Sequence, residues 1–82
     1  MRNYHAETIG ELEKFIEKVK SSRIDDALRG DISCFEIDSM AIQYTQTKIG
    51  RLKAMSRDEI ASYNSKAARD ALENTRHACF GY

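Results

Sequence analysis

Residues able to do acid–base or nucleophilic chemistry are few in this chain and widely separated. Its two histidines are His5 and His77, and its two cysteines are Cys34 and Cys79. His77 and Cys79 are two positions apart, so on a helix their side chains point to different faces and do not form one site. A Cys/His metal site would need a further ligand nearby. We therefore expect structural or surface roles for both histidines, and neither a metal nor any other cofactor.

Two pairs of adjacent carboxylates, Asp25–Asp26 and Asp58–Glu59, are the remaining candidates for acid–base catalysis. Each pair follows a predicted helix start, where the helix dipole favours negative charge. The sequence holds none of the short motifs typical of zinc proteases, nucleotide-binding loops or serine hydrolases. The sequence therefore predicts a protein that is not an enzyme.

Serine or threonine followed three positions later by glutamate indicates a helix start, because each side chain can bind a backbone N–H near the other residue. Three such pairs occur: Thr8–Glu11, Ser33–Glu36 and Ser56–Glu59. Apolar residues at helical spacing follow each pair. Ser22 with Asp25 is a weaker start signal, and Gly30 is suited to end the short helix that would follow it.

These signals predict two short helices, over residues 8–20 and 22–28, and then two longer ones over residues 34–55 and 57–79. The chain turns at Met55–Ser56, and residues 31–33 form a linker, although residues 31–37 would also suit an extended segment. The alanine-rich face of residues 57–79 allows close helix packing. The predicted fold is all-α: a small helical bundle of two short N-terminal helices plus a long antiparallel αα-hairpin, in one helical domain over residues 1–82.

A turn at Met55–Ser56 would place Cys34 and Cys79 at the same level, because they stand almost equally far from it. We expect their Cα atoms to lie within about 10 Å at the free end of the hairpin. In a reducing compartment both would remain thiols, and under oxidising conditions they could form a disulfide.

The composition suits a soluble, globular chain: 41% of its 82 residues are hydrophobic, 32% are charged, and the net charge is zero. Residues 1–47 carry six basic and nine acidic side chains, whereas residues 48–82 carry seven and four. No apolar run is long enough to span a membrane and no apolar leader begins the chain, so we expect a cytoplasmic protein with free thiols.

The basic second half raises the alternative of a DNA-binding or nucleoid-associated regulator. Residues 59–72 weakly resemble a helix-turn-helix, in which Asn64 would take the left-handed turn position and Lys66, Arg69 and Arg76 would face the duplex. The spacing is short for that motif, and the interleaved Asp70 and Glu73 would repel phosphate. A continuous helix explains the same residues, so this alternative is disfavoured.

A second, local resemblance involves the first predicted helix. Thr8-Ile9, Leu12-Glu13 and Ile16-Glu17-Lys18 resemble a helix of the Hha/YmoA co-regulators, which are small helical proteins that bind nucleoid proteins. The resemblance covers about thirteen residues, and the chain lacks that family's proline and tryptophan near the C-terminus. It would imply a helical regulator that acts by binding another protein.

Several large side chains exceed what two packed layers can hide, and they belong to types favoured at adaptable interfaces. They are Met40, Tyr44, Met55, Tyr63, Phe80 and Tyr82. We expect a non-catalytic protein-binding module that self-associates, most simply as a dimer, and acts as a small inhibitor, adaptor or regulator. Its size also suits an accessory protein of a phage or mobile element. The alternatives are that the first two helices cover these residues, or that an oligomer sequesters a small ligand between its subunits.

Overall fold

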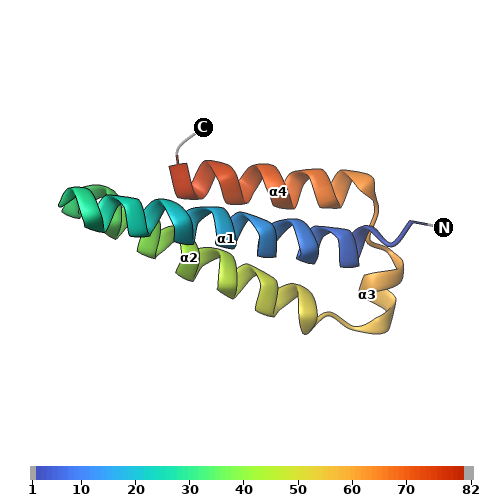
Figure 1. Ribbon diagram of the computed structural model, residues 1–82. Helices are drawn as coiled ribbons and strands as arrows, with labels where there is room; N and C mark the ends of the chain where they lie inside the picture. The colour runs from blue at the N-terminus through green and yellow to red at the C-terminus, as the bar shows by residue number, and fades with distance from the viewer. Residues whose placement is uncertain (1, 81–82) are drawn as a thin grey trace.

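The computed structural model describes residues 2–80, which form four α-helices and no strand. They are α1 (Tyr4–Arg29), α2 (Ile32–Lys53), α3 (Arg57–Ala61) and α4 (Ser65–Phe80). Figure 1 shows α1 and α2 as a long antiparallel hairpin, with α4 lying along it and α3 at the end near the N-terminus. The predicted small all-α bundle with a long αα-hairpin is confirmed, but the hairpin pairs α1 with α2 and not residues 34–55 with residues 57–79 as predicted.

The turn between α1 and α2 is built around Gly30, whose φ of 74° lies in the left-handed region that a glycine adopts without strain. Its N–H donates to the carbonyl of Ala27 at 3.2 Å, and the Asp31 N–H donates to the carbonyl of Asp26 at 2.9 Å. Asp31 then caps α2, because its Oδ1 accepts the Cys34 N–H at 3.1 Å. Gly30 ends a helix as predicted, while α2 begins at Ile32, so the linker expected at residues 31–33 is absent.

The first helix is continuous, and the break predicted at Ser21–Ser22 does not occur. Leu12, Ile16 and Val19 are buried on one face of α1, and packing of that face outweighs the weak helix propensity of two serines. The helix starts before Thr8, because the Asn3 side chain accepts the Ala6 N–H at 3.0 Å and acts as the cap. The two short N-terminal helices are therefore one long helix.

The predicted helix over residues 57–79 is broken at residues 62–64. The expected capping box of Ser56 and Glu59 is confirmed and starts α3, but α3 ends after five residues. Asn64 then provides a second cap, since its Oδ1 accepts the Ala67 N–H at 2.9 Å. Asparagine favours caps over helix interiors, and this preference explains the break.

Because the predicted helix is broken, Cys79 packs at a different height along α2 from the one predicted. Its Sγ lies 3.7 Å from the Ala41 carbonyl oxygen and 3.9 Å from Thr45 Oγ1, while Cys34 is seven residues before Ala41. Seven residues span about 10 Å along a helix. Cys79 therefore does not lie at the level of Cys34, because α4 begins at Ser65 rather than at the predicted corner, and both thiols are free.

The hydrophobic core lies between α1 and α2 and is closed by α4. Its buried members are Leu12, Ile16, Val19, Ala41, Ile42, Ile49 and Leu52, with Leu72 and Cys79 of α4 packed against them. Within residues 2–80, no helix combines the length and the hydropathy needed to cross a membrane.

Candidate functional site

The two ends of the α1–α2 hairpin are built differently. We call the end that carries α3 and the N-terminus the closed end, and the turn with its flanking residues 20–44 the open end. α4 has 16 residues and α1 has 26, so α4 does not reach the turn, which projects beyond it (Figure 1). The open end therefore has a side that no helix within residues 2–80 covers.

His5 belongs to the closed end and has a structural role there. It is buried, and its Nε2 donates to the Leu52 carbonyl oxygen at 2.6 Å, since a carbonyl oxygen only accepts. The Tyr63 ring meets the His5 ring edge-on, with the ring centroids 5.7 Å apart. These contacts tie α1, α2 and the turn before α4 together.

The open end exposes large apolar side chains. Leu28 is 82% exposed and Met40 is 69% exposed. The complete set, which we call the open-end apolar surface, is Ile24, Leu28, Ile32, Phe35, Ile37, Met40 and Tyr44. Ile37, Met40 and Tyr44 share one face of α2 and line a groove with Ala78 and Cys79 of α4.

The residues predicted to bind a partner divide between different environments. Met40 and Tyr44 lie in the open-end apolar surface. Met55 and Tyr63 are half-buried and pack against the core. The side chain of Phe80 and the whole of Tyr82 fall outside the described residues.

The three basic residues of the nucleic-acid alternative, Lys66, Arg69 and Arg76, are exposed along α4. Asp70 and Glu73 are exposed on the same helix between them. Asn64 does not take the left-handed conformation expected for it, because no non-glycine residue from 2 to 80 has a positive φ. The five-residue α3 is also short for the first helix of a helix-turn-helix.

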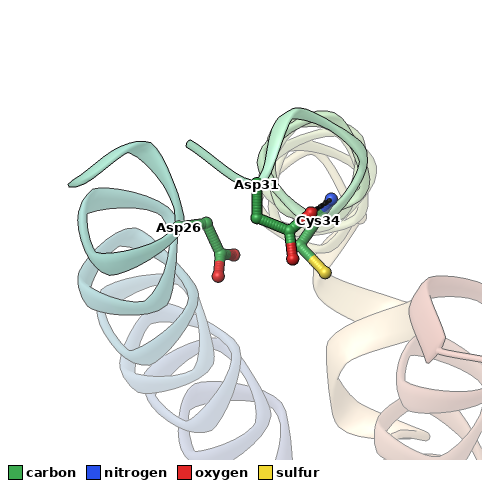
Figure 2. A group of neighbouring side chains, drawn as sticks. All are labelled: Asp26, Asp31 and Cys34. Atoms are coloured by element: carbon green, nitrogen blue, oxygen red, sulfur yellow. Dashed lines mark hydrogen bonds between the residues drawn. The ribbon is translucent and has the colours of Figure 1, made fainter. Parts of the chain in front are cut away.

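The open end also gathers four acidic or thiol side chains, which we call the open-end acidic cluster: Asp26, Asp31, Cys34 and Asp38. Figure 2 shows that Asp26 of α1, Cys34 of α2 and Asp31, the cap of α2, extend toward the same region. Each of these three offers an oxygen or sulfur atom within 4.8 Å of the other two. Asp26 is only 3% exposed, whereas Cys34 is exposed to solvent.

Hydrogen bonds link each of Asp26, Asp31 and Cys34 to a neighbour, and for Asp31 and Cys34 they shift the pKa. The Arg29 guanidinium donates to Oδ1 of Asp26. The Cys34 N–H hydrogen bond lowers the pKa of the Asp31 carboxyl. A side-chain hydrogen bond to Asp31, followed by burial and the charges of the neighbouring carboxylates, raises the pKa of the Cys34 thiol. Cys34 is therefore held as a thiol beside Asp31 in the metal-free protein.

Asp38 adjoins this group from the second turn of α2 and is 6% exposed. Its Oδ2 atom is buried and has no hydrogen-bond partner among the described residues. Burial raises the pKa of Asp38, and the neighbouring Asp26 carboxyl raises it further, while Ser22 and Arg23 lower it. Two carboxyl groups are thus buried side by side, and one oxygen of Asp38 has no hydrogen-bond donor.

Sequence reasoning missed this cluster because it misplaced a helix boundary. The sequence pattern predicts that Asp25–Asp26 begins a short helix, whereas Asp26 lies in the last turns of α1. The available signal was Gly30: a tight turn at a glycine brings residues just before it close to those just after it. Asp26 and Asp31 flank that glycine, and Cys34 follows one turn later.

Comparisons with family models, curated proteins and solved structures found no match for this chain. The local resemblance to the Hha/YmoA co-regulators is therefore not supported by a match to a family model.

Proposed function

We propose that this chain is a non-catalytic protein-binding module that self-associates through its open end and acts as a small regulator or adaptor. The observation that carries the proposal is the open-end apolar surface. Every large hydrophobic side chain exposed among the described residues belongs to the hairpin between Ile24 and Tyr44, beyond or beside the end of α4. Large exposed apolar side chains gathered at one end of a molecule are typical of interaction surfaces.

The face formed by Ile37, Met40 and Tyr44 favours a second copy of this chain as the partner that binds there. These residues are spaced as a helix–helix packing stripe, and the groove beside them ends at small residues of α4. Two copies packed about a twofold axis would bury the same stripe from both chains. Methionine adapts to different neighbours, so the same surface also suits a different helical partner.

Sedimentation equilibrium at micromolar concentrations tests this proposal. We expect a mass of twice the 9.4 kDa chain for the wild type and a shift toward monomer for Met40→Lys, because a lysine charge cannot be buried in an apolar interface. Gln46→Lys is the matched control, since Gln46 is exposed on α2 but outside the open-end apolar surface. A monomer at all concentrations, or an equal effect of both variants, would contradict the proposed self-association.

Salt dependence separates this function from the nucleic-acid alternative. Phosphate contacts release counterions, so a duplex-binding protein loses affinity steeply as salt rises. We expect no retained duplex at ~150 mM salt, where specific binders still hold their sites. A gel shift that survives at that salt, and is lost in Lys66→Ala or Arg69→Ala, would instead assign the chain to DNA-binding regulators.

A further inference from the structure

We propose that the open end binds one Zn²⁺ ion per chain through Asp26, Asp31 and Cys34, with Asp38 as an adjoining acidic group that strengthens the binding. This inference concerns the acidic cluster between the helices and does not depend on what covers the open-end apolar surface.

The first argument is the arrangement of the ligand atoms. Zinc binds carboxylate oxygen at about 2.0–2.2 Å and thiolate sulfur at about 2.3 Å, so atoms that share one ion lie roughly 3–4 Å apart. The three atoms offered by Asp26, Asp31 and Cys34 all lie within 4.8 Å of one another. Asp26 comes from α1, Cys34 comes from α2 and Asp31 caps α2, so the three lie on either side of Gly30 in the chain. Small side-chain rotations would bring them onto a shared ion.

The second argument is the unsatisfied charge beside them. Buried carboxylates are ordinarily paired with cations, hydrogen-bonded or bound to metal. Asp38 is buried with Oδ2 unpartnered, and it sits against Asp26, which is buried as well. Arg29 engages one oxygen of Asp26 and the charge of Arg23 acts on Asp38, so two cations face the three carboxyl groups of the cluster. A divalent cation among these residues would supply the missing charge.

The ligand types select the ion. Calcium and magnesium take oxygen ligands almost exclusively, whereas zinc accepts thiolate together with carboxylate. Binding would transfer the Cys34 thiol proton to solvent and form a sulfur–zinc bond, with no change of oxidation state. Cys34 is exposed, so the ion can reach it. The bound ion would link the last turns of α1 to the first turn of α2, where α4 gives no support.

The experiment is a zinc titration of the untagged, reduced chain followed by thermal unfolding, with Co²⁺ as a spectroscopic substitute. For a ligand that binds only the folded chain, a hundredfold excess over the dissociation constant should raise the melting temperature by about 10 °C or more. Co²⁺ should give a sulfur-to-cobalt charge-transfer band. We expect one ion per chain.

Variants assign the site. Cys34→Ser should remove the charge-transfer band and the melting shift, and Asp38→Asn should weaken binding at least tenfold, in the range of residues that support metal ligands. Asp38→Asn also removes repulsion from Asp26, so it should leave the metal-free fold intact. Cys79→Ser and Asp25→Asn are matched controls outside the cluster and should bind as the wild type does. The proposal is overturned if zinc causes no shift, if Cys34→Ser binds equally well, or if Cys79→Ser is the variant that loses binding.

Discussion

The closed and open ends of the hairpin use the facing sides of α1 and α2 in opposite ways. Toward the closed end these sides carry Leu12, Ile16 and Leu52, which are buried. Toward the turn they carry Asp26 and Asp38, which are equally buried. The same two helices therefore have an apolar interior at one end and an acidic interior at the other.

The length of α4 accounts for much of this difference. At 1.5 Å per residue, α4 covers about 24 Å of a helix, α1, that is about 39 Å long. Where α4 is present, three helices enclose the core and exclude water. Where it is absent, two helices alone cannot bury a wide apolar face, so Leu28 and Ile32 are left in solvent. We infer that the closed end supplies the stability and that the open end is available for binding.

Leucine-to-alanine variants give the largest expected contrast between the ends. Leu12 is 1% exposed in the core, and Leu12→Ala should lower the free energy of unfolding by about 3 kcal/mol, through lost burial and the cavity left behind. Leu28→Ala should change it by less than about 0.5 kcal/mol, because Leu28 is almost fully in solvent. Urea unfolding at a concentration where the chain is monomeric measures both. Similar losses in the two variants would show that the open end is covered in solution.

A glycine pair gives the next contrast, of about 1 kcal/mol in opposite directions. Gly30→Ala should destabilise the turn by about 1–2 kcal/mol, because alanine resists a positive φ. Gly50→Ala, inside α2, should stabilise the chain by about 0.5–1 kcal/mol through helix propensity. A methyl group at either position meets no atom within 4 Å, so both effects are backbone effects. If Gly30→Ala were neutral, the turn would not need its left-handed residue, and the placement of the acidic cluster would lose its structural basis.

The sequence predicted the fold class and some of the local helix signals. It did not predict which of two competing signals would prevail. The capping box of Ser56 and the helix stop at Gly30 were predicted because each depends on residues within one turn. The continuity of α1 through Ser21 and Ser22 was not, because contacts with α2 decide it. Asn64 presented the same difficulty: its capping strength had to be weighed against an alanine-rich helical face.

Some residues of the candidate sites could be predicted from the sequence and others could not, because only some of them depend on residues nearby in the chain. Met40 and Tyr44 were identified as surface residues from composition and spacing alone. The role of His5 depends on the Leu52 carbonyl oxygen, 47 positions away, which no local pattern reveals. The acidic cluster depends on the two helix ends meeting across Gly30, so its recognition required the correct end of α1.

The smallest expected effect concerns acid and the cap of α3 at the closed end. Hydrogen bonds from the Ser56 backbone and side chain lower the pKa of Glu59 below its ordinary value of 4.5. The ionised form therefore stabilises the fold: this contribution is complete above pH 4.5 and is lost as pH falls through the folded-state pKa. Glu59→Gln, which keeps an oxygen for the Ser56 N–H but not the charge, should melt slightly below the wild type at pH 6, and the difference should shrink as the pH is lowered to 3. Asp58→Asn in the same turn is the control for simple loss of negative charge near the helix start. If Glu59→Gln differed from the wild type equally at both pH values, the stabilisation would come from packing and not from the charged cap.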